Sequence, residues 1–380
     1  VPVDLLEKLS ALLRNNHFGI TVTLFNNQII NFEGGDTHRE IYGVAFDIGT
    51  TTMAGYLLQL KPVRELGVLA QTNPQSKYGY DIISRIGFTV NNKDGSSQIQ
   101  KEIISAFNEM IFSLSGKANI DFRKISLTVF VGNTCMQHLL WRLPVQYLAV
   151  APYIPVIRQG MLNEAGELAD YCLPAHMPVY TAPAVSAYIG GDVIADLIDC
   201  SWWKKKGNVL LVDLGTNGEI VLKTQDGIWA CSAAAGPAFE GINIQSGMRA
   251  VRGAIDKVNM NKQGLRYHTM GEVSAAGLCG SGIIDLVAGL LNLGVIQSNG
   301  KMIKSEECPD LISDCIRKRI QLFQANNNAF LVVPQNESAI GESIYFTQKD
   351  IREVQLAKGA IMSGIAILLK QAKISSDDID

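Results

Sequence analysis

Residues 44–58, VAFDIGTTTMAGYLL, consist of two apolar runs joined across the polar turn Asp47-Ile48-Gly49-Thr50-Thr51-Thr52. This pattern predicts two strands and a tight connection that can hold a phosphate. Gly49 has no Cβ, so a phosphate can approach the backbone, and the hydroxyl and N–H groups of Thr50, Thr51 and Thr52 can donate to its oxygens. Asp47 is expected to face the phosphate through hydrated Mg²⁺, which takes one or two carboxylates. Ordinary hairpins also contain such turns, so this stretch alone leaves a structural turn open.

The same pattern returns at residues 209–222, VLLVDLGTNGEIVL, in which Asp213 ends an apolar run and Gly215, Thr216 and Asn217 form the turn. A repeat at this spacing predicts two similar lobes that hold one nucleotide between them. Asp47 and Asp213 would then hold the hydrated Mg²⁺ from both sides. Paired hairpins of this kind resemble those of actin, hexokinase and the heat-shock chaperone ATPases. The predicted fold class is therefore α/β, a two-lobed actin-like ATPase (ASKHA) fold in which each lobe is a mixed sheet flanked by helices.

Composition agrees with a two-lobed enzyme. The chain has 380 residues, of which 47% are hydrophobic and 18% charged, enough to bury two cores without a disordered tract. A net charge of −3 gives no electrostatic reason to expect nucleic acid or an anionic membrane as a partner. The sequence contains neither an apolar run of about 18 residues nor the pattern of a signal peptide. We therefore expect a cytoplasmic protein.

The seven cysteines are an odd number without regular spacing, which argues against a disulfide framework. No Cys-x-x-Cys occurs, so neither a zinc site nor a self-contained iron–sulfur cluster is indicated. A cluster shared between subunits stays open. Cys279, within GLCGSG at residues 277–282, has the most suggestive position, although a small buried residue beside a helix start is its more ordinary interpretation.

The pattern along the chain predicts three parts. Residues 1–40 are expected to be the end of an upstream small α+β domain plus a linker, with a helix at 3–13 and a hairpin that turns at Asn26-Asn27. Residues 41–199 are expected to form the first lobe and residues 200–380 the second.

Several further side chains of the first lobe are candidates for the cleft. The apolar strand at 127–131 ends at Asn133 and Thr134, and ligands sit at strand ends in open α/β sheets. Thr134 is also expected to cap the following helix through His138, itself more ordinarily a satisfied helix histidine. A small-residue helix at 186–197 and its counterpart at 359–366 would cross closely at a hinge. Asp192 in the first of them could orient water or metal, or serve packing alone.

Three other segments carry expectations. Asn73-Pro74 predicts a turn, and Asp81 and Arg85 lie one helical turn apart, which favours a surface ion pair of little energetic weight. Residues 147–180 are expected to be a wandering connection. Thr347-Gln348-Lys349-Asp350 predicts a capping box before a long amphipathic helix.

The second lobe has two glycine-rich segments that predict helix starts, at residues 234–241 and 280–282. Helix N-termini bind anions, so either segment could touch ribose or phosphate. Neither is specific by itself. The candidate residues are Gly236, Glu240, Gly280, Ser281 and Gly282.

Taken together, these motifs resemble the ATP-dependent reductive activators of corrinoid proteins. The resemblance implies use of ATP and Mg²⁺ to return an inactive Co(II) corrinoid to the Co(I) state on a corrinoid protein or a corrinoid-dependent methyltransferase. It also implies an electron donor, and it leaves a homodimer open. It rests on DIGTTT at 47–52, the block at 73–86, GNT at 132–134, DLGTNGE at 213–219, AGPAFEG at 235–241, CGSG at 279–282 and residues 350–358.

Two departures from that family matter. Its members carry an iron–sulfur module, and no cysteine cluster stands in this sequence. The superfamily also places a glycine-rich adenosine loop after the last helix, whereas these residues stop at 375–380, where the strand before that loop should begin. The resemblance therefore implies an iron–sulfur cluster in the full-length protein but not in this segment, with part of the nucleotide pocket missing.

Three other classes share the fold. A small-molecule kinase needs substrate-binding groups near the γ-phosphate, and none is identifiable beyond Asp47, Asp192 and Asp213. A chaperone-like ATPase needs a peptide-binding module, which these residues lack. An activator of the 2-hydroxyacyl-CoA dehydratase type would hold iron at a dimer interface through Cys279.

Overall fold

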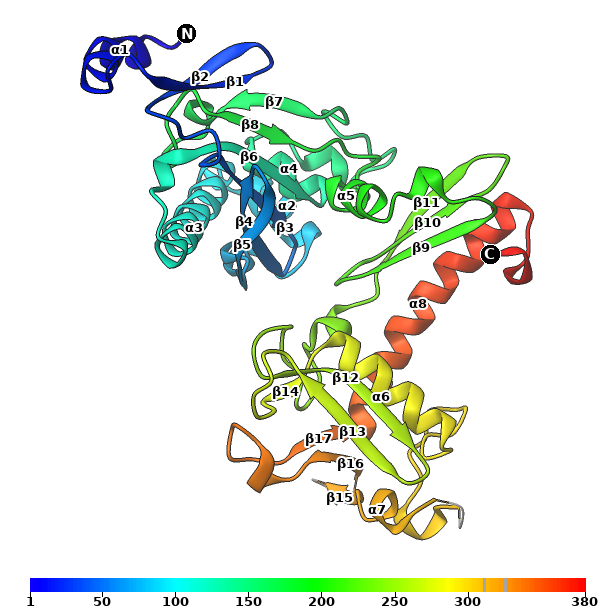
Figure 1. Ribbon diagram of the computed structural model, residues 1–380. Coiled ribbons are helices and arrows are strands. Elements are labelled where there is room, and N and C mark those ends of the chain that lie inside the picture. Colours follow the sequence, from blue (N-terminus) through cyan, green and yellow to red (C-terminus); the bar gives the residue numbers. More distant parts are fainter. Residues whose placement is uncertain (310–311, 324–326) are drawn as a thin grey trace. The chain divides into compact units, whose positions relative to one another are not determined.

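The computed structural model describes residues 1–309, 312–323 and 327–380. The chain divides into two compact units, Val1–Lys205 and Lys206–Asp380 (Figure 1). In the described ranges, no helix combines the length and apolar character needed to cross a membrane.

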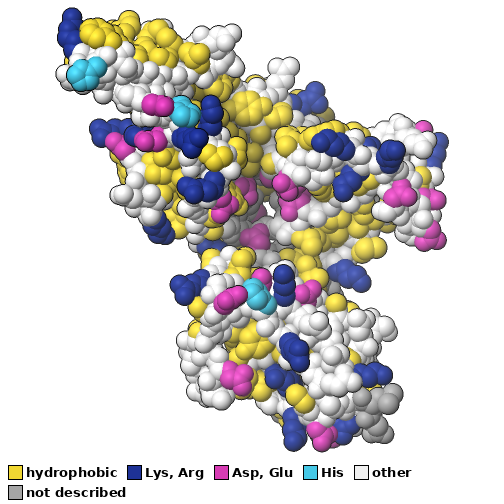
Figure 2. Space-filling view, in the orientation of Figure 1, with side chains coloured by type: hydrophobic (Ala, Val, Ile, Leu, Met, Phe, Trp, Pro, Cys, Tyr) yellow, Lys and Arg dark blue, Asp and Glu magenta, His cyan; other side chains and the backbone are white. Residues whose placement is uncertain are grey.

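The first unit begins with a helix and a hairpin, as the sequence predicts: α1 (Val3–Asn15), β1 (Ile20–Phe25) and β2 (Gln28–Gly34). Asn26 and Asn27 both have positive φ, which suits the tight turn between strands. His176 joins this piece to the rest of the unit, because its Nε2 lies 3.1 Å from the Ile30 carbonyl oxygen. Figure 2 shows hydrophobic side chains gathered on the outside of this piece, where Val3 and Leu24 are exposed.

A six-stranded mixed sheet forms the body of the first unit, in the order β5-β4-β3-β6-β8-β7. β3 is central, antiparallel to β4 and parallel to β6. The strands are β3 (Tyr42–Ile48), β4 (Thr52–Leu60), β5 (Val63–Thr72), β6 (Ile125–Gly132), β7 (Met161–Glu164) and β8 (Pro178–Thr181). The helices are α2 (Ile82–Asn91), α3 (Gly95–Ala118), α4 (Thr134–Leu140) and α5 (Gly191–Asp199).

A cluster of aromatic rings sets which side chains of β3 face the core. Phe46 on β3 lies opposite Phe130 on β6, with ring centroids 5.5 Å apart, and Phe107 of α3 packs 4.5 Å from Phe46. All three rings are buried. Because side chains alternate across a strand, burying Phe46 directs the neighbouring Asp47 to the other face of the sheet.

Two expectations for the first unit are wrong. Part of the supposed connection at 147–180 is sheet, because β8 pairs in parallel with β6 and β7 pairs with β8. Each strand has only four residues and β8 begins with a proline, so the local pattern is too short to indicate a strand. The helix expected at 186–197 begins only at Gly191, since Ser186 and Ile189 form a bridge in a preceding turn.

The second unit divides its strands among three three-stranded sheets in the part of the chain that is described. The first is β9 (Val209–Leu214), β10 (Gly218–Lys223) and β11 (Ile228–Ala233); the second is β12 (Ala254–Asn261), β13 (Gly264–Thr269) and β14 (Gly277–Leu278); the third is β15 (Ile320–Phe323), β16 (Asn327–Val333) and β17 (Ile344–Thr347). The helices are α6 (Gly280–Asn292), α7 (Asp314–Arg317) and α8 (Gln348–Ala372).

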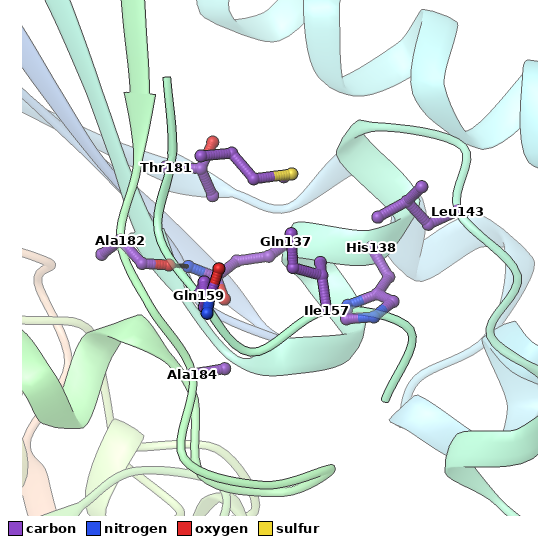
Figure 3. A pocket seen from close by; sticks show the side chains of 9 residues that line it. Gln137, His138, Leu143, Ile157, Gln159, Thr181, Ala182 and Ala184 are labelled. Atoms are coloured by element: carbon purple, nitrogen blue, oxygen red, sulfur yellow. Dashed lines mark hydrogen bonds between the residues drawn. The ribbon is translucent and has the colours of Figure 1, made fainter. Parts of the chain in front are cut away.

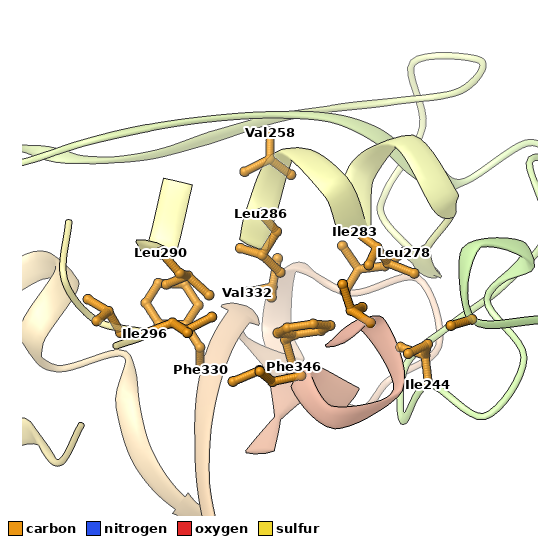
Figure 4. Packing of buried hydrophobic residues seen from close by; sticks show 14 of the residues in the cluster. Ile244, Val258, Leu278, Ile283, Leu286, Leu290, Ile296, Phe330, Val332 and Phe346 are labelled. Atoms are coloured by element: carbon orange, nitrogen blue, oxygen red, sulfur yellow. The ribbon is translucent and has the colours of Figure 1, made fainter. Parts of the chain in front are cut away.

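The long helix α8 packs against the β9–β11 sheet at one end and against β16 and β17 at the other (Figure 1). It starts with the predicted capping box, in which the Thr347 hydroxyl accepts from the Asp350 N–H and the Asp350 carboxylate accepts from the Thr347 N–H. A Cβ at Gly364 would lie 2.6 Å from Ile220, so this glycine lets helix and sheet approach closely. Figure 4 shows the core beneath α6, where Leu286, Phe330 and Phe346 interdigitate.

Replacing Phe46 by alanine should destabilise the first unit by about 3–5 kcal/mol, because it opens a cavity between two aromatic rings. The measurement is chemical denaturation of the first unit's transition. Phe112→Ala serves as the control, since Phe112 is half exposed. Equal effects of the two substitutions would contradict the role given to the buried cluster.

Candidate functional site

The β3–β4 turn of the first unit is held by its carbonyl groups. The Gly49 carbonyl accepts from Nδ2 of Asn73 at 2.8 Å, and the Thr50 carbonyl accepts from Nη2 of Arg85 at 2.5 Å. The Thr51 carbonyl accepts from the Asn73 N–H at 2.9 Å. A Cβ on Gly49 would lie 2.4 Å from the Thr52 carbonyl oxygen, so only glycine fits the first position.

The direction of these carbonyls sets the direction of the amides. In a trans peptide the C=O and the following N–H point to opposite sides. Because the carbonyls of Gly49 and Thr50 are bonded to Asn73 and Arg85, the N–H groups of Thr50 and Thr51 point away from those residues. Successive N–H groups that face one side form a concavity suited to an anion. These amide directions are compatible with the phosphate grip that the sequence motif predicts, and phosphate binding itself stays a prediction.

The expected surface ion pair between Asp81 and Arg85 is wrong. Arg85 is fully buried, and its Nε donates to the Gly79 carbonyl at 2.9 Å. Asp81 instead caps α2, accepting from the N–H and hydroxyl of Ser84 at 2.7 Å. A signal was available in the sequence, since Arg85 shares the buried helical face of Ile82 and Ile86. The spacing of four residues shows which side chains are neighbours on a helix but not which face is buried.

Other predicted residues of the first unit gather near the ends of β3 and β6. Asp47 lies opposite Val131 in the parallel pair, so its strand end is level with Gly132. A Cβ at Gly132 would lie 2.6 Å from the Ile48 carbonyl oxygen, and one at Gly190 only 2.2 Å from the Gly132 carbonyl oxygen. These glycines bring the start of α5, which carries Asp192, directly against the end of β6. The Asp192 carboxylate accepts from the Val193 N–H at 2.8 Å.

The side chains of Asn133 and Thr134 are occupied within the fold. Asn133, rather than Thr134, caps α4, because its carboxamide oxygen accepts from the Cys135 N–H at 2.9 Å. The buried Thr134 hydroxyl donates to the Ser186 carbonyl at 2.6 Å. Contact of either residue with a ligand stays a prediction.

His138 is a structural histidine, as the more ordinary interpretation held. Its Nδ1 bonds to the Thr134 carbonyl at 2.8 Å, and its Nε2 accepts from the Val156 N–H at 3.2 Å. Burial lowers the pKa of His138. Figure 3 shows the cavity beside it, also lined by Gln137 and Thr181. Its volume of about 10 Å³ matches one water molecule and excludes a nucleotide.

The turn of the second unit is held by different chemistry. Gly215 donates to the Asn217 carbonyl at 3.1 Å, and Gly236 donates to the Thr216 carbonyl at 2.9 Å. The Thr216 hydroxyl donates to the Glu240 carboxylate. The segment that follows β11 thus holds this turn through one amide and one carboxylate, which brings Gly236 and Glu240 beside Thr216.

The negative charges of Asp213 and Glu240 repel each other at this turn. Burial raises the pKa of Asp213, the Leu214 N–H opposes that shift, and the charge of Glu240 adds to it. In the described part of the chain, the buried Oε2 of Glu240 has no hydrogen-bond partner. A partly desolvated carboxylate and an unpaired carboxylate oxygen form a donor set that fits a hard, hydrated cation such as Mg²⁺.

The glycine-rich starts in this unit differ from expectation. Residues Pro237–Glu240 form a single 3-10 turn instead of an α-helix, because Gly241 follows in the left-handed region. α6 does begin at Gly280, as predicted. Close packing accounts for its glycines, since a Cβ at Gly280 or Gly282 would lie 2.1 Å from a backbone carbonyl oxygen.

The side chains beside these glycines are also engaged. The Ser281 hydroxyl donates to the Asp256 carbonyl at 2.7 Å, and the buried Cys279 thiol donates to the Ile255 carbonyl at 3.2 Å. Cys279 therefore matches its more ordinary interpretation as a small buried residue beside a helix start. Among the described residues, no three His, Cys, Asp or Glu side chains lie close enough together to hold a metal ion.

The structure thus assembles two sets of predicted residues, one in each unit. The set in the first unit is Asp47, Gly49, Thr50, Thr51, Thr52, Asn133, Thr134 and Asp192. The set in the second unit is Asp213, Gly215, Thr216, Asn217, Gly236 and Glu240. The remaining predicted residues, Gly280, Ser281 and Gly282, begin α6, which packs against the segment Pro237–Glu240. That the two sets share one nucleotide stays a prediction.

Comparison with known proteins assigns the chain to a family. A model of the RACo middle region matches residues 42–205, and a model of the C-terminal domain of RACo, the ASKHA domain, matches residues 207–380. The chain belongs to the RACo family. The expected ASKHA fold and the family resemblance are thereby confirmed.

Three relatives agree with this assignment. The corrinoid activation enzyme RamQ of Eubacterium limosum is 35% identical over 364 residues, covering 94% of this chain and 60% of that protein. The Co(II) methylated amine-specific corrinoid protein reductase of Methanosarcina barkeri is 24% identical over 371 residues, covering 90% of this chain and 62% of that protein. A solved structure of a reductive activator for corrinoid, iron-sulfur protein matches with a TM-score of 0.84 and 32% identity, over 99% of this chain and 59% of that one. The chain thus spans about 60% of the length of these relatives.

Asp213→Asn should stabilise the second unit at pH 7. The folded unit raises the pKa of Asp213, so the charged carboxylate costs stability above that pKa, and the cost disappears as the pH falls through it. We expect the melting temperature of the variant to exceed that of wild type by a few degrees at pH 7, with the difference shrinking toward about pH 4.

The control for this pH series is Asp226→Asn, because Asp226 is exposed in the β10–β11 turn. It should leave the melting temperature unchanged. A lower melting temperature for Asp213→Asn at pH 7 would show that the Asp213 carboxylate is already compensated in the free protein.

Proposed function

We propose that the complete protein uses ATP to drive reduction of a corrinoid protein from Co(II) to Co(I), and that residues 42–380 bind and hydrolyse the nucleotide. One observation carries this: the chain matches two successive regions of RACo, and each region contributes one Asp-x-Gly-Thr turn braced by its own unit. The names of the relatives, a corrinoid activation enzyme and a Co(II) corrinoid protein reductase, support the substrate class.

In this proposal the two turns have separate tasks. The N–H groups of Thr50 and Thr51, with the hydroxyls of the Thr50–Thr52 run, bind phosphate oxygens in the first unit. Asp47 and Asp213 hold hydrated Mg²⁺, which when bound neutralises charge that develops on the transferring phosphate. Glu240 orients Thr216 through the bond to its hydroxyl. Asp192, at the start of α5, orients water.

The coupling to reduction follows from binding energies. For a one-electron couple, each roughly 59 mV of unfavourable potential is a tenfold penalty in the equilibrium constant. A nucleotide can offset that penalty only if the nucleotide-bound protein binds the corrinoid protein most tightly in a state that accepts an electron more readily. The electron comes from a donor outside residues 42–380, and we propose an iron–sulfur cluster of the full-length protein as that donor.

The alternatives are a small-molecule kinase of the same fold and an activator of the 2-hydroxyacyl-CoA dehydratase type. The second needs a cysteine that reaches an interface. Cys279 is buried and its thiol donates to the Ile255 carbonyl, which speaks against it as that ligand. The kinase alternative is separated from our proposal by its product, a phosphorylated small molecule.

Asp47→Asn or Asp213→Asn should lower Mg-ATP hydrolysis by about two orders of magnitude or more while leaving the fold intact, because an amide binds hydrated Mg²⁺ far more weakly than a carboxylate. Steady-state ATPase assays of the complete protein provide the measurement. Asp94→Asn is a matched control, since Asp94 is exposed and its side chain forms no cap bond at the start of α3. If the variant carrying both Asp47→Asn and Asp213→Asn hydrolysed ATP at the wild-type rate, the proposed site formed by the two turns would be wrong.

The corrinoid step has its own test. The full-length protein, given ATP and a low-potential donor under anaerobic conditions, should convert a Co(II) corrinoid protein to Co(I), followed by its visible spectrum. Residues 1–380 alone should bind the corrinoid protein in a nucleotide-dependent way but should not reduce it. Phosphorylation of a sugar or carboxylic acid without a change of the cobalt state would favour the kinase alternative.

A further inference from the structure

Arg85 is a buried cation without a carboxylate partner. Its side chain is fully buried, and no carboxylate of the described residues forms an ion pair with it. Asp81, one turn earlier on the chain, accepts from Ser84; its charge opposes the lowering of the Arg85 pKa but forms no ion pair with the guanidinium. Burial lowers the pKa of Arg85 to about 10, so the guanidinium stays charged at neutral pH. The nearby Cys135 does not compensate it, because burial raises the pKa of that thiol to about 12.

All the bonds of this guanidinium go to neutral groups. Nη2 donates to the Thr50 carbonyl, Nε to the Gly79 carbonyl, and Nη1 lies 3.0 Å from Sδ of Met136 and 3.5 Å from Oε1 of Gln75. Nε2 of the buried Gln75 has no hydrogen-bond partner in the described residues. A neutral donor would satisfy a carbonyl at lower desolvation cost. The positive charge of Arg85 thus carries a desolvation cost that a neutral donor at this position would avoid.

The charge lies directly behind the phosphate turn. The Thr50 carbonyl and the Thr51 N–H belong to one peptide group, so a cation on the oxygen polarises the N–H on the other side and strengthens it as a donor. A phosphate oxygen on that N–H would be roughly 7–8 Å from Nη2, the sum of two hydrogen bonds and one peptide group. That distance is within the screening length of physiological salt, and screening is weaker for a buried charge.

We propose that Arg85 is a positioning residue that fixes the direction of the Thr50–Thr51 peptide and makes nucleotide binding depend on phosphate charge, with the phosphates of the bound nucleotide as its missing counter-charge. This inference rests on the proposed nucleotide site of the β3–β4 turn. It adds that the segment Pro74–Tyr78 and helix α2, which hold Arg85 in place, set the site's preference for nucleotides rich in phosphate.

The test compares Arg85→Lys, which keeps the charge, with Arg85→Gln, which removes it, in the complete protein. Affinities for ATP, ADP and adenosine are measured by competition against a fluorescent nucleotide, with kcat and KM for ATP alongside. Arg85→Gln should lose at least 10-fold in affinity for ATP, less for ADP, and under 2-fold for adenosine. Arg85→Lys should keep the ratio of ATP to adenosine affinity within about 3-fold of wild type while losing kcat, because a single ammonium cannot reproduce the planar fork.

Two matched controls separate this role from support of the scaffold. Arg123→Gln removes an exposed arginine paired with Asp121 and should change none of the affinities. Asp81→Ala removes the cap of α2, and any effect it has should weaken ATP and adenosine equally. A merely structural Arg85 would give that same uniform loss.

Each outcome of these measurements supports or overturns the role proposed for Arg85. A uniform loss for all three ligands in Arg85→Gln, or wild-type affinities in that variant, overturns the inference while leaving the nucleotide site in place. If Arg85→Gln does not fold, Arg85→Lys carries the test, and a loss of more than 10-fold in its ratio of ATP to adenosine affinity overturns the inference. Failure of the wild-type protein to bind ATP would instead remove the proposed function itself.

Discussion

The inward direction of three successive carbonyls, those of Gly49, Thr50 and Thr51, is the constraint on which the first unit's site depends. Asn73 and Arg85 hold them from one side, so the amides of the turn must face the other. The aromatic cluster around Phe46 fixes the register that delivers the turn to this place. A slip of one residue would reverse the faces of Phe46 and Asp47, burying a carboxylate among rings.

The two turns have the same sequence pattern but opposite electrostatic support. A buried guanidinium bonds to the turn of the first unit, whereas the partly buried carboxylate of Glu240 bonds to the turn of the second. The charge of Glu240 also adds to the raised pKa of Asp213. The charge beside the first turn favours an anion and the charges beside the second favour a cation, which agrees with the separate tasks given to the two turns in the proposed function. Sequence repetition alone does not reveal this asymmetry, because the supporting residues lie outside the repeat.

Features set by local sequence could be predicted, and features set by packing could not. The hairpins, the start of α6 and the capping box at Thr347 follow from turn and cap chemistry within a few residues. β7 and β8 could not be predicted, because strands of four residues are defined by the strands with which they pair. The expected 186–197 helix begins later than predicted, because Ser186 and Ile189 form a β-bridge. Arg85 is predicted at the surface because the side chain is charged, although its position on the helix lies on the same face as Ile82 and Ile86. A charged residue in phase with Ile82 and Ile86 is better taken as a sign of function than as an exposed neighbour.

Each unit holds a partly desolvated charge, Arg85 in the first unit and the carboxylate of Asp213 in the second. Desolvation of each charge costs stability, and under the proposed function each is relieved by one component of Mg-ATP. A ligand that relieves such a cost binds the state in which it meets the opposite charge more tightly than it binds other states. That differential affinity is the quantity a nucleotide needs to shift a conformational equilibrium. Under the proposed function, these charges supply part of the bias by which hydrolysis, which removes one phosphate charge, releases a partner.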